Sequence, residues 1–177
     1  ISWTSQTSGT SESLMGITFS NNTFIATGAS GVILTSTDGT SWISRSSGIT
    51  HNLYDVKYGI SKFFVVNNGG TTISSTDGTS WSSQVSIAPT SLNSITYGKS
   101  IFVTVGNSGV IYTSSNGSNW TSRTSGTSNT LLGVVFGDST FVTVSDNGGI
   151  FTSPDGTTWT SVSSGTTETF NGITFAE

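Results

Sequence analysis

The chain has 177 residues, of which 8% are charged and 11% are aromatic, with a net charge of −4 and no cysteine. This composition leaves no basic surface for a nucleic acid partner and excludes a disulfide framework or a thiolate metal site. No apolar run in the sequence approaches the roughly 20 residues of a membrane-spanning helix, so we expect no membrane partner.

The chain repeats itself every 39 residues, because its tryptophans stand at positions 3, 42, 81, 120 and 159. Four full repeats follow one another without insertion or deletion, at residues 14–52, 53–91, 92–130 and 131–169. Residues 1–13 carry the end of a further copy and residues 170–177 carry the beginning of one. A fixed period of about 40 residues is typical of a tandem array of one supersecondary unit.

The first repeat predicts four strands in chain order. Ile17 and Phe19 alternate with polar residues and indicate an inner strand with one buried face. Phe24 opens a second strand, residues 32–35 form a third, and residues 42–45 form a polar outer strand. We expect the outer strand again at residues 81–84 and 120–123.

Four hairpin-joined strands per repeat are typical of a propeller blade. The sequence therefore predicts an all-β chain, a β-propeller of four-stranded antiparallel blades with four complete blades and a split partial blade. A β-solenoid and a flat meander are the alternatives that the same strands leave open.

One motif, Ser-x-Asp-Gly-x-Ser/Thr-Trp, joins the third strand to the fourth in every repeat. In the first copy Asp38 can accept hydrogen bonds from backbone N–H groups, Gly39 lets the chain reverse, and Trp42 places a large ring on the neighbouring layer. The predicted structural residues are Asp38, Asp77, Asn116 and Asp155, with Trp42, Trp81, Trp120 and Trp159.

This motif resembles the Asp-box (BNR) repeat of sialidase-like propellers, with a spacing one residue tighter and with Asn116 in place of aspartate in the third copy. It is also similar to the repeats of photosystem II assembly propellers. The resemblance implies a structural box on the face away from any ligand, and no reaction. Sialidases hold the substrate carboxylate with three arginines, whereas this chain has only Arg45 and Arg123, at equivalent positions of separate repeats. The resemblance therefore implies a non-catalytic member.

The sequence contains few residues that could form a metal site or another kind of catalytic site. The single histidine, His51, has no second imidazole with which to form a metal site or a triad. The nine acidic residues are spread over different turns and repeats, so no carboxylate pair is indicated. We predict no catalytic residue, no metal and no cofactor.

Binding is the remaining function, and in propellers the loops opposite the box share one face. The candidate ligand-binding residues there are His51, Asn52, Tyr54, Asn67, Asn107, Asp146 and Asn147. Amides and hydroxyls suit carbohydrate hydroxyl groups, although each residue can also be read as a simple turn former.

The sequence thus predicts a binding module, with weak multivalent glycan binding on a bacterial or phage surface protein, extracellular or on the virion. The alternatives are a structural or assembly scaffold for a protein partner, and a fragment or designed propeller with no activity of its own.

The length of the chain bears on whether the ring of blades closes. Five full repeats would need 195 residues, which is 18 more than the chain has. In a closed ring the two ends would supply the inner and outer strands of one blade. We expect a fragment of a larger ring of five to seven blades, a homo-oligomer that completes the split blade, or a blade rebuilt from two strands.

Overall fold

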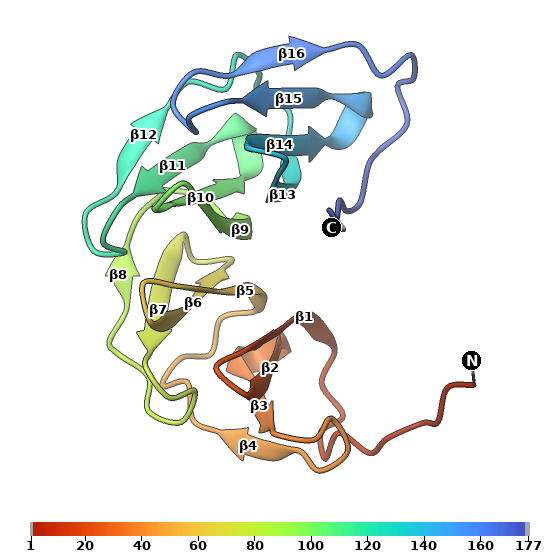
Figure 1. The fold of residues 1–177 in the computed structure, drawn as a ribbon, viewed down its shortest axis with the longest axis vertical. Coiled ribbons are helices and arrows are strands. Elements are labelled where there is room, and N and C mark those ends of the chain that lie inside the picture. The colour runs from red at the N-terminus through yellow and green to blue at the C-terminus, as the bar shows by residue number, and fades with distance from the viewer. Residues whose placement is uncertain (1, 176–177) are drawn as a thin grey trace.

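The computed structural model describes residues 2–175 and folds them into sixteen strands in four antiparallel sheets of four strands each. The sheets stand as blades along an arc that remains open between its first and last blades (Figure 1). Within residues 2–175, no helix combines the length and the apolar character needed to cross a bilayer.

Each blade contains four strands that follow one another in the chain and pair in that order. Blade 1 contains β1 (Leu14–Ser20), β2 (Thr23–Gly28), β3 (Ile33–Ser36) and β4 (Ile43–Arg45). Blade 2 contains β5 (Leu53–Gly59), β6 (Lys62–Asn67), β7 (Thr71–Ser75) and β8 (Val85–Ser86). Blade 3 contains β9 (Leu92–Gly98), β10 (Ile101–Gly106), β11 (Ile111–Ser114) and β12 (Thr121–Arg123). Blade 4 contains β13 (Leu131–Gly137), β14 (Thr140–Ser145), β15 (Ile150–Ser153) and β16 (Thr160–Val162). The prediction of an all-β propeller with four-stranded blades is confirmed.

The outer strand of blade 2 corrects one prediction, because it lies at Val85–Ser86 and not at residues 81–84. Blades 1 and 3 pair Ile33 with Arg45 and Ile111 with Arg123, whereas blade 2 pairs Thr72 with Val85, one residue later. The Ser82 hydroxyl accepts a hydrogen bond from the Ser74 N–H at 3.0 Å. This side-chain bond takes up a backbone donor of the third strand, so regular pairing begins further along the chain.

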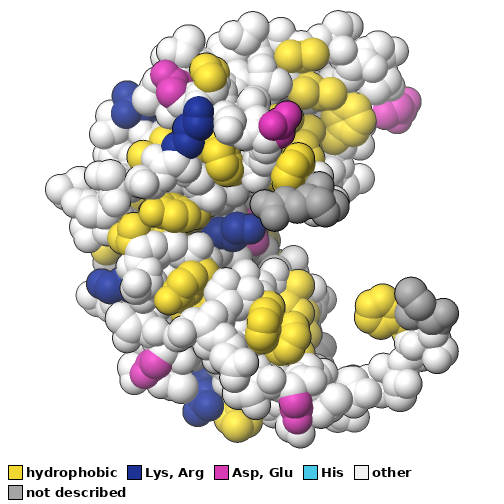
Figure 2. Space-filling view, viewed as in Figure 1, with side chains coloured by type: hydrophobic (Ala, Val, Ile, Leu, Met, Phe, Trp, Pro, Cys, Tyr) yellow, Lys and Arg dark blue, Asp and Glu magenta, His cyan; other side chains and the backbone are white. Residues whose placement is uncertain are grey.

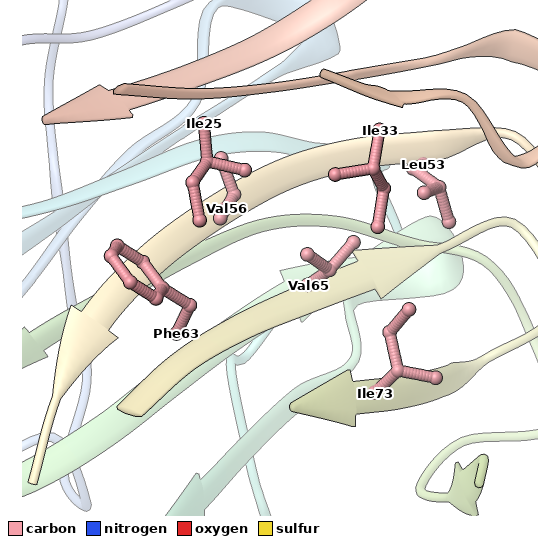
Figure 3. Packing of buried hydrophobic residues seen from close by; sticks show 7 residues of the cluster. All are labelled: Ile25, Ile33, Leu53, Val56, Phe63, Val65 and Ile73. Atoms are coloured by element: carbon pink, nitrogen blue, oxygen red, sulfur yellow. The ribbon is translucent and has the colours of Figure 1, made fainter. Parts of the chain in front are cut away.

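Apolar side chains of the inner, second and third strands hold adjacent blades together. Ile25 and Ile33 of blade 1 pack against Leu53 and Val56 of β5, and each of the four is at most 1% exposed (Figure 3). The second and third strands of blade 1 thereby cover the inner strand of blade 2, and Val103 and Ile111 cover β13 in the same way. At the junction of blades 2 and 3 the apolar cover comes from β6 and Ala88, because Thr72 stands where blade 1 has Ile33. Because this burial requires a following or a preceding blade, the terminal blades each have one face without a full partner.

The turn between the third and fourth strands, here called the tryptophan turn (residues 36–42, 75–81, 114–120 and 153–159), has the same geometry in each blade. In blade 1 the Asp38 carboxylate accepts hydrogen bonds from the N–H groups of Thr40 and Ser41, both at 2.8 Å. The Trp42 indole N–H donates to the Gly39 carbonyl at 3.2 Å. These bonds satisfy backbone donors within the turn, which explains why the motif is repeated so faithfully.

The two ends of the described chain do not combine into a fifth blade. Residues 2–10 form no strand, and Trp3 is 95% exposed. In each complete blade the outer strand pairs with the third strand, and the terminal copy has no third strand to offer. Residues 2–10 and 170–175 are therefore not paired with each other as strands, and Figure 1 shows residues 2–10 leading away from blade 1 and the chain after β16 returning to the inner side of blade 4.

Candidate functional site

A cavity of about 540 Å³ lies where the inner strands of the blades converge. Its wall takes one equivalent residue from every repeat, namely Met15, Tyr54, Asn93, Leu132 and Asn171. The register of the inner strand shifts across this position in blades 1, 2 and 4, so two successive residues can face the centre of the arc. The strict repeat of the blades thus brings five different side chains to one place.

The neighbouring position adds a carboxylate. Asp55 and Ser94 line the cavity, whereas the equivalent residue is glycine in the other copies: Gly16, Gly133 and Gly172. The Ser94 hydroxyl donates to Asp55 Oδ2 at 2.8 Å, and the Ile95 N–H donates to the same oxygen at 3.0 Å. These bonds join β5 to β9 across the blade junction.

Burial raises the pKa of the Asp55 carboxyl above its ordinary value of 3.8. The hydrogen bonds from Ile95 and Ser94, and the charge of Lys57, oppose this rise without cancelling it. Asp55 still has some exposed surface at the cavity, so its carboxyl is desolvated mainly by the strands behind it. The centre of the arc therefore holds a carboxyl group with a raised pKa.

Amide side chains form the adjoining part of the cavity wall. The Asn93 amide donates to Asn107 Oδ1 at 3.0 Å and to the Leu131 carbonyl at 2.9 Å. Both bonds fix the orientation of Asn93, and the Asn107 bond links β9 to the turn that follows β10. Tyr54 and Leu132 supply apolar surface beside these amides.

Two of the seven residues predicted to bind a ligand, Tyr54 and Asn107, lie at this cavity. His51 is exposed on the loop before β5 and lies outside the cavity wall. Asn147 is exposed and has the left-handed backbone conformation (φ 55°) of a turn residue. The structure thus brings together only part of the predicted set.

The other predicted residues hold turns. Asn67 is fully buried and accepts the Gly69 N–H at 2.9 Å. The Asn52 side-chain oxygen accepts the Ser30 N–H at 3.1 Å, and Asp146 accepts the Thr130 N–H at 3.0 Å. Their polar atoms are engaged by the backbone, as expected for turn formers.

Sequence reasoning missed Asp55, Asn93 and Ser94 at the cavity. A signal was present, because the central position changes from Met15 to Tyr54 to Asn93 while the residue before it is leucine in each of these copies. In an otherwise strict repeat, the position at which the residue type changes from copy to copy is the one that faces the centre of the arc.

The cavity offers hydrogen-bond donors and acceptors beside apolar surface, which is a surface that can recognise amide and hydroxyl groups. Within residues 2–175, no cluster of three or more histidine, aspartate or glutamate side chains has the arrangement to hold a metal ion.

Solved structures with the same arrangement include YCF48 from Cyanidioschyzon merolae, with a TM-score of 0.71 and 21% identity over 93% of this chain and 60% of that chain. A structure of YCF48 bound to a D1 peptide gives a TM-score of 0.73 and 21% identity, over 92% of this chain and 57% of that chain. The computationally designed Ika4 protein gives 0.64 and 16% identity, over 82% of this chain and 92% of that chain.

At these identities the likeness shows the fold. The chain spans no more than about 60% of the length of the two YCF48 structures. Among curated proteins none matches the sequence significantly. Residues 82–175, more than half of the chain, match the model of the DUF6242 β-propeller domain. The chain belongs to the DUF6242 β-propeller domain family.

Proposed function

We propose that the chain is a non-catalytic protein-binding scaffold that holds a peptide segment of its partner at the central cavity. The single observation that carries this proposal is the wall itself, where Tyr54, Asn93 and Asp55 come together from two adjacent inner strands. A peptide presents an N–H at every residue other than proline. The Asn93 NH2 group is already bonded to Asn107 and Leu131, so Asn93 offers its side-chain oxygen as an acceptor for such an N–H. The apolar neighbours Met15 and Leu132 suit peptide side chains.

The fold supports the same proposal, because a YCF48 structure of similar fold is bound to a D1 peptide. That ligand is a property of YCF48, and it indicates that a propeller of this shape can hold a peptide. Our first prediction from the sequence, glycan binding through the loops, has less support here, because Asn52, Asn67 and Asp146 lie outside the cavity wall.

The tryptophan turns fit the Asp-box reading, because their carboxylates and amides bond only within the turn. We infer that they are structural and lie outside the binding site. A surface location on a bacterium or a virion stays a prediction.

The test is a selection from a random peptide display library, run in parallel with a glycan array. We expect the wild-type chain to select peptides, and the Asn93→Ala and Tyr54→Ala variants to lose them. Retained glycans with no selected peptide would contradict the proposal and favour the glycan reading.

A further inference from the structure

The inner strand of blade 1 leaves an apolar face uncovered. Leu14, Ile17 and Phe19 of β1 are 44%, 63% and 53% exposed. The equivalents of Ile17 in the later blades are at most 4% exposed, namely Val56, Ile95 and Val134. Figure 2 shows hydrophobic side chains gathered over β1 and β2, beside the opening of the arc. A face that is buried in three blades thus lacks its partner in one.

The junctions between consecutive blades show which surface can cover the apolar face of β1. At the junctions of blades 1 and 2 and of blades 3 and 4, the inner strand is covered by the second and third strands of the preceding blade, as Ile25 and Ile33 cover Leu53 and Val56 (Figure 3). The surface that complements β1 is therefore the second and third strands of a blade.

The chain carries that surface at its other end, on β14 and β15. Val142 and Ile150 there remain partly exposed, whereas their equivalents in blade 3, Val103 and Ile111, are fully buried. Residues 170–175, here called the C-terminal segment, cover only part of this surface.

The C-terminal segment copies β1 in sequence and takes the position of an inner strand. Residues 172–175 and residues 16–19 both read Gly-Ile-Thr-Phe. A side chain at Gly137 would collide with the Phe175 ring, just as a side chain at Gly98 would collide with the Phe136 ring of the next blade. Phe175 therefore occupies the place that the inner strand of a following blade would take.

The C-terminal segment lacks the strand pairing that β1 has. It forms no strand, and its Phe170 N–H donates to the Ser145 carbonyl at 3.3 Å. Phe175 remains 47% exposed. In contrast, β1 is paired with β2 from Ser20 back to Leu14, so it is preorganised for docking and loses less conformational freedom.

We propose that β1 of one copy of this chain docks head to tail on β14 and β15 of a second copy, in place of the C-terminal segment. The partner is a second copy because β1 carries the sequence that already occupies this surface, and because both faces are apolar. Residues 2–10 stay outside the junction, since β16 already pairs with β15. A head-to-tail junction gives closed rings or open chains of copies. The inference does not rest on peptide binding, although the segment that is displaced contributes Asn171 to the cavity wall.

The experiment measures the mass of the 177-residue chain by light scattering and by sedimentation over a range of concentrations. Phe175→Asp removes the apolar anchor of the C-terminal segment, and we expect it to strengthen self-association by at least roughly tenfold relative to the wild type. Adding Ile17→Asp to this variant should return it to the monomer. Ile43→Asp is the matched control, because Ile43 is 55% exposed but lies on the outer strand β4, and it should leave the association intact.

A mixing experiment tests the direction of docking. On the Phe175→Asp background, Ile17→Asp disables β1 and Val142→Asp disables the β14 surface, so an equimolar mixture should form dimers that neither variant forms alone. Circular dichroism confirms that each variant is folded. A Phe175→Asp chain that stays monomeric at the highest concentration, or an Ile43→Asp effect equal to that of Ile17→Asp, would overturn the proposal.

Discussion

Asp55 and Ser94 hold the same position in consecutive repeats, and the Ser94 hydroxyl donates a 2.8 Å hydrogen bond to the Asp55 carboxylate. Glycine fills this position in the other copies, so the bond exists only at the junction of blades 2 and 3. It connects two inner strands at the wall of the central cavity. A departure from the repeat has thus produced both a contact between blades and a polar group at the candidate site.

The raised pKa of Asp55 makes stability depend on pH. Because the folded chain holds this proton more tightly than the unfolded chain, the contribution is fully present below the ordinary pKa of 3.8 and is lost as the pH rises through the raised value. We expect Asp55→Asn to gain stability relative to the wild type as the pH rises from acidic to neutral. Urea unfolding at a series of pH values measures the difference.

Asp138→Asn is the matched control for the loss of one negative charge, since Asp138 lies on an exposed turn. A stability difference between Asp55→Asn and the wild type that is flat, or that reverses with rising pH, would contradict this account of Asp55.

The tryptophan turns have the opposite pH dependence. Hydrogen bonds from the Ser41 and Thr40 N–H groups, with a smaller contribution from the Ser36 hydroxyl, lower the pKa of Asp38 well below 3.8. Stability from this carboxylate is therefore present above pH 3.8 and is lost as the pH falls below it. Blade 3 provides an internal comparison, because Asn116 accepts the same bonds with a group that does not titrate.

We expect Asp38→Asn to lose less stability than the wild type on acidification, and Asn116→Asp to lose more. Denaturation at pH values on both sides of the ordinary aspartate pKa measures both changes. Equal acid sensitivity of the two variants would show that the turn carboxylates do not act in this way.

Thr27 is a buried polar residue whose replacement should stabilise the chain. Its hydroxyl has no hydrogen-bond partner among the described residues, and the equivalent residue is valine in the other three blades: Val66, Val105 and Val144. Thr27→Val keeps the shape and removes the unpaired hydroxyl, so we expect a gain of about 1–2 kcal/mol in the free energy of unfolding.

The same replacement at Thr104 is the control for Thr27. The Thr104 hydroxyl is buried and donates to the Ser94 carbonyl at 2.9 Å, so Thr104→Val should cost about 1 kcal/mol. Thermal and chemical unfolding of both variants measures the contrast. A loss of stability in Thr27→Val would mean that its hydroxyl is satisfied in solution.

The blades could be predicted from the sequence because their physical causes are local and are repeated every 39 residues. Alternation at Ile17 and Phe19 indicated the inner strand, and the turn motif indicated the boundary between the third strand and the outer strand. The shift of β8 could not be predicted, since it depends on a single side-chain bond from Ser74 to Ser82. Such competition between side chain and backbone has no periodic signature.

The candidate site was predicted only in part, for a related reason. Polar residues in turns were chosen by type, and Asn67 and Asp146 proved to be bonded to the backbone beside them. Asp55 and Asn93 lie in strands, where polar residues are usually read as solvent-facing. Their common cavity exists only because the arc brings the inner strands together, and the sequence does not show that curvature directly.

The central claim is that peptides bind at the cavity, and an equilibrium titration of a selected, fluorescently labelled peptide tests it most directly. The wild type is compared with Asn93→Ala at the wall and with His51→Ala, which alters an exposed residue outside the wall. We predict at least roughly tenfold weaker binding for Asn93→Ala, a cost near 1.4 kcal/mol, and unchanged binding for His51→Ala. Equal affinity of the wild type and Asn93→Ala, or a loss confined to His51→Ala, would contradict the account.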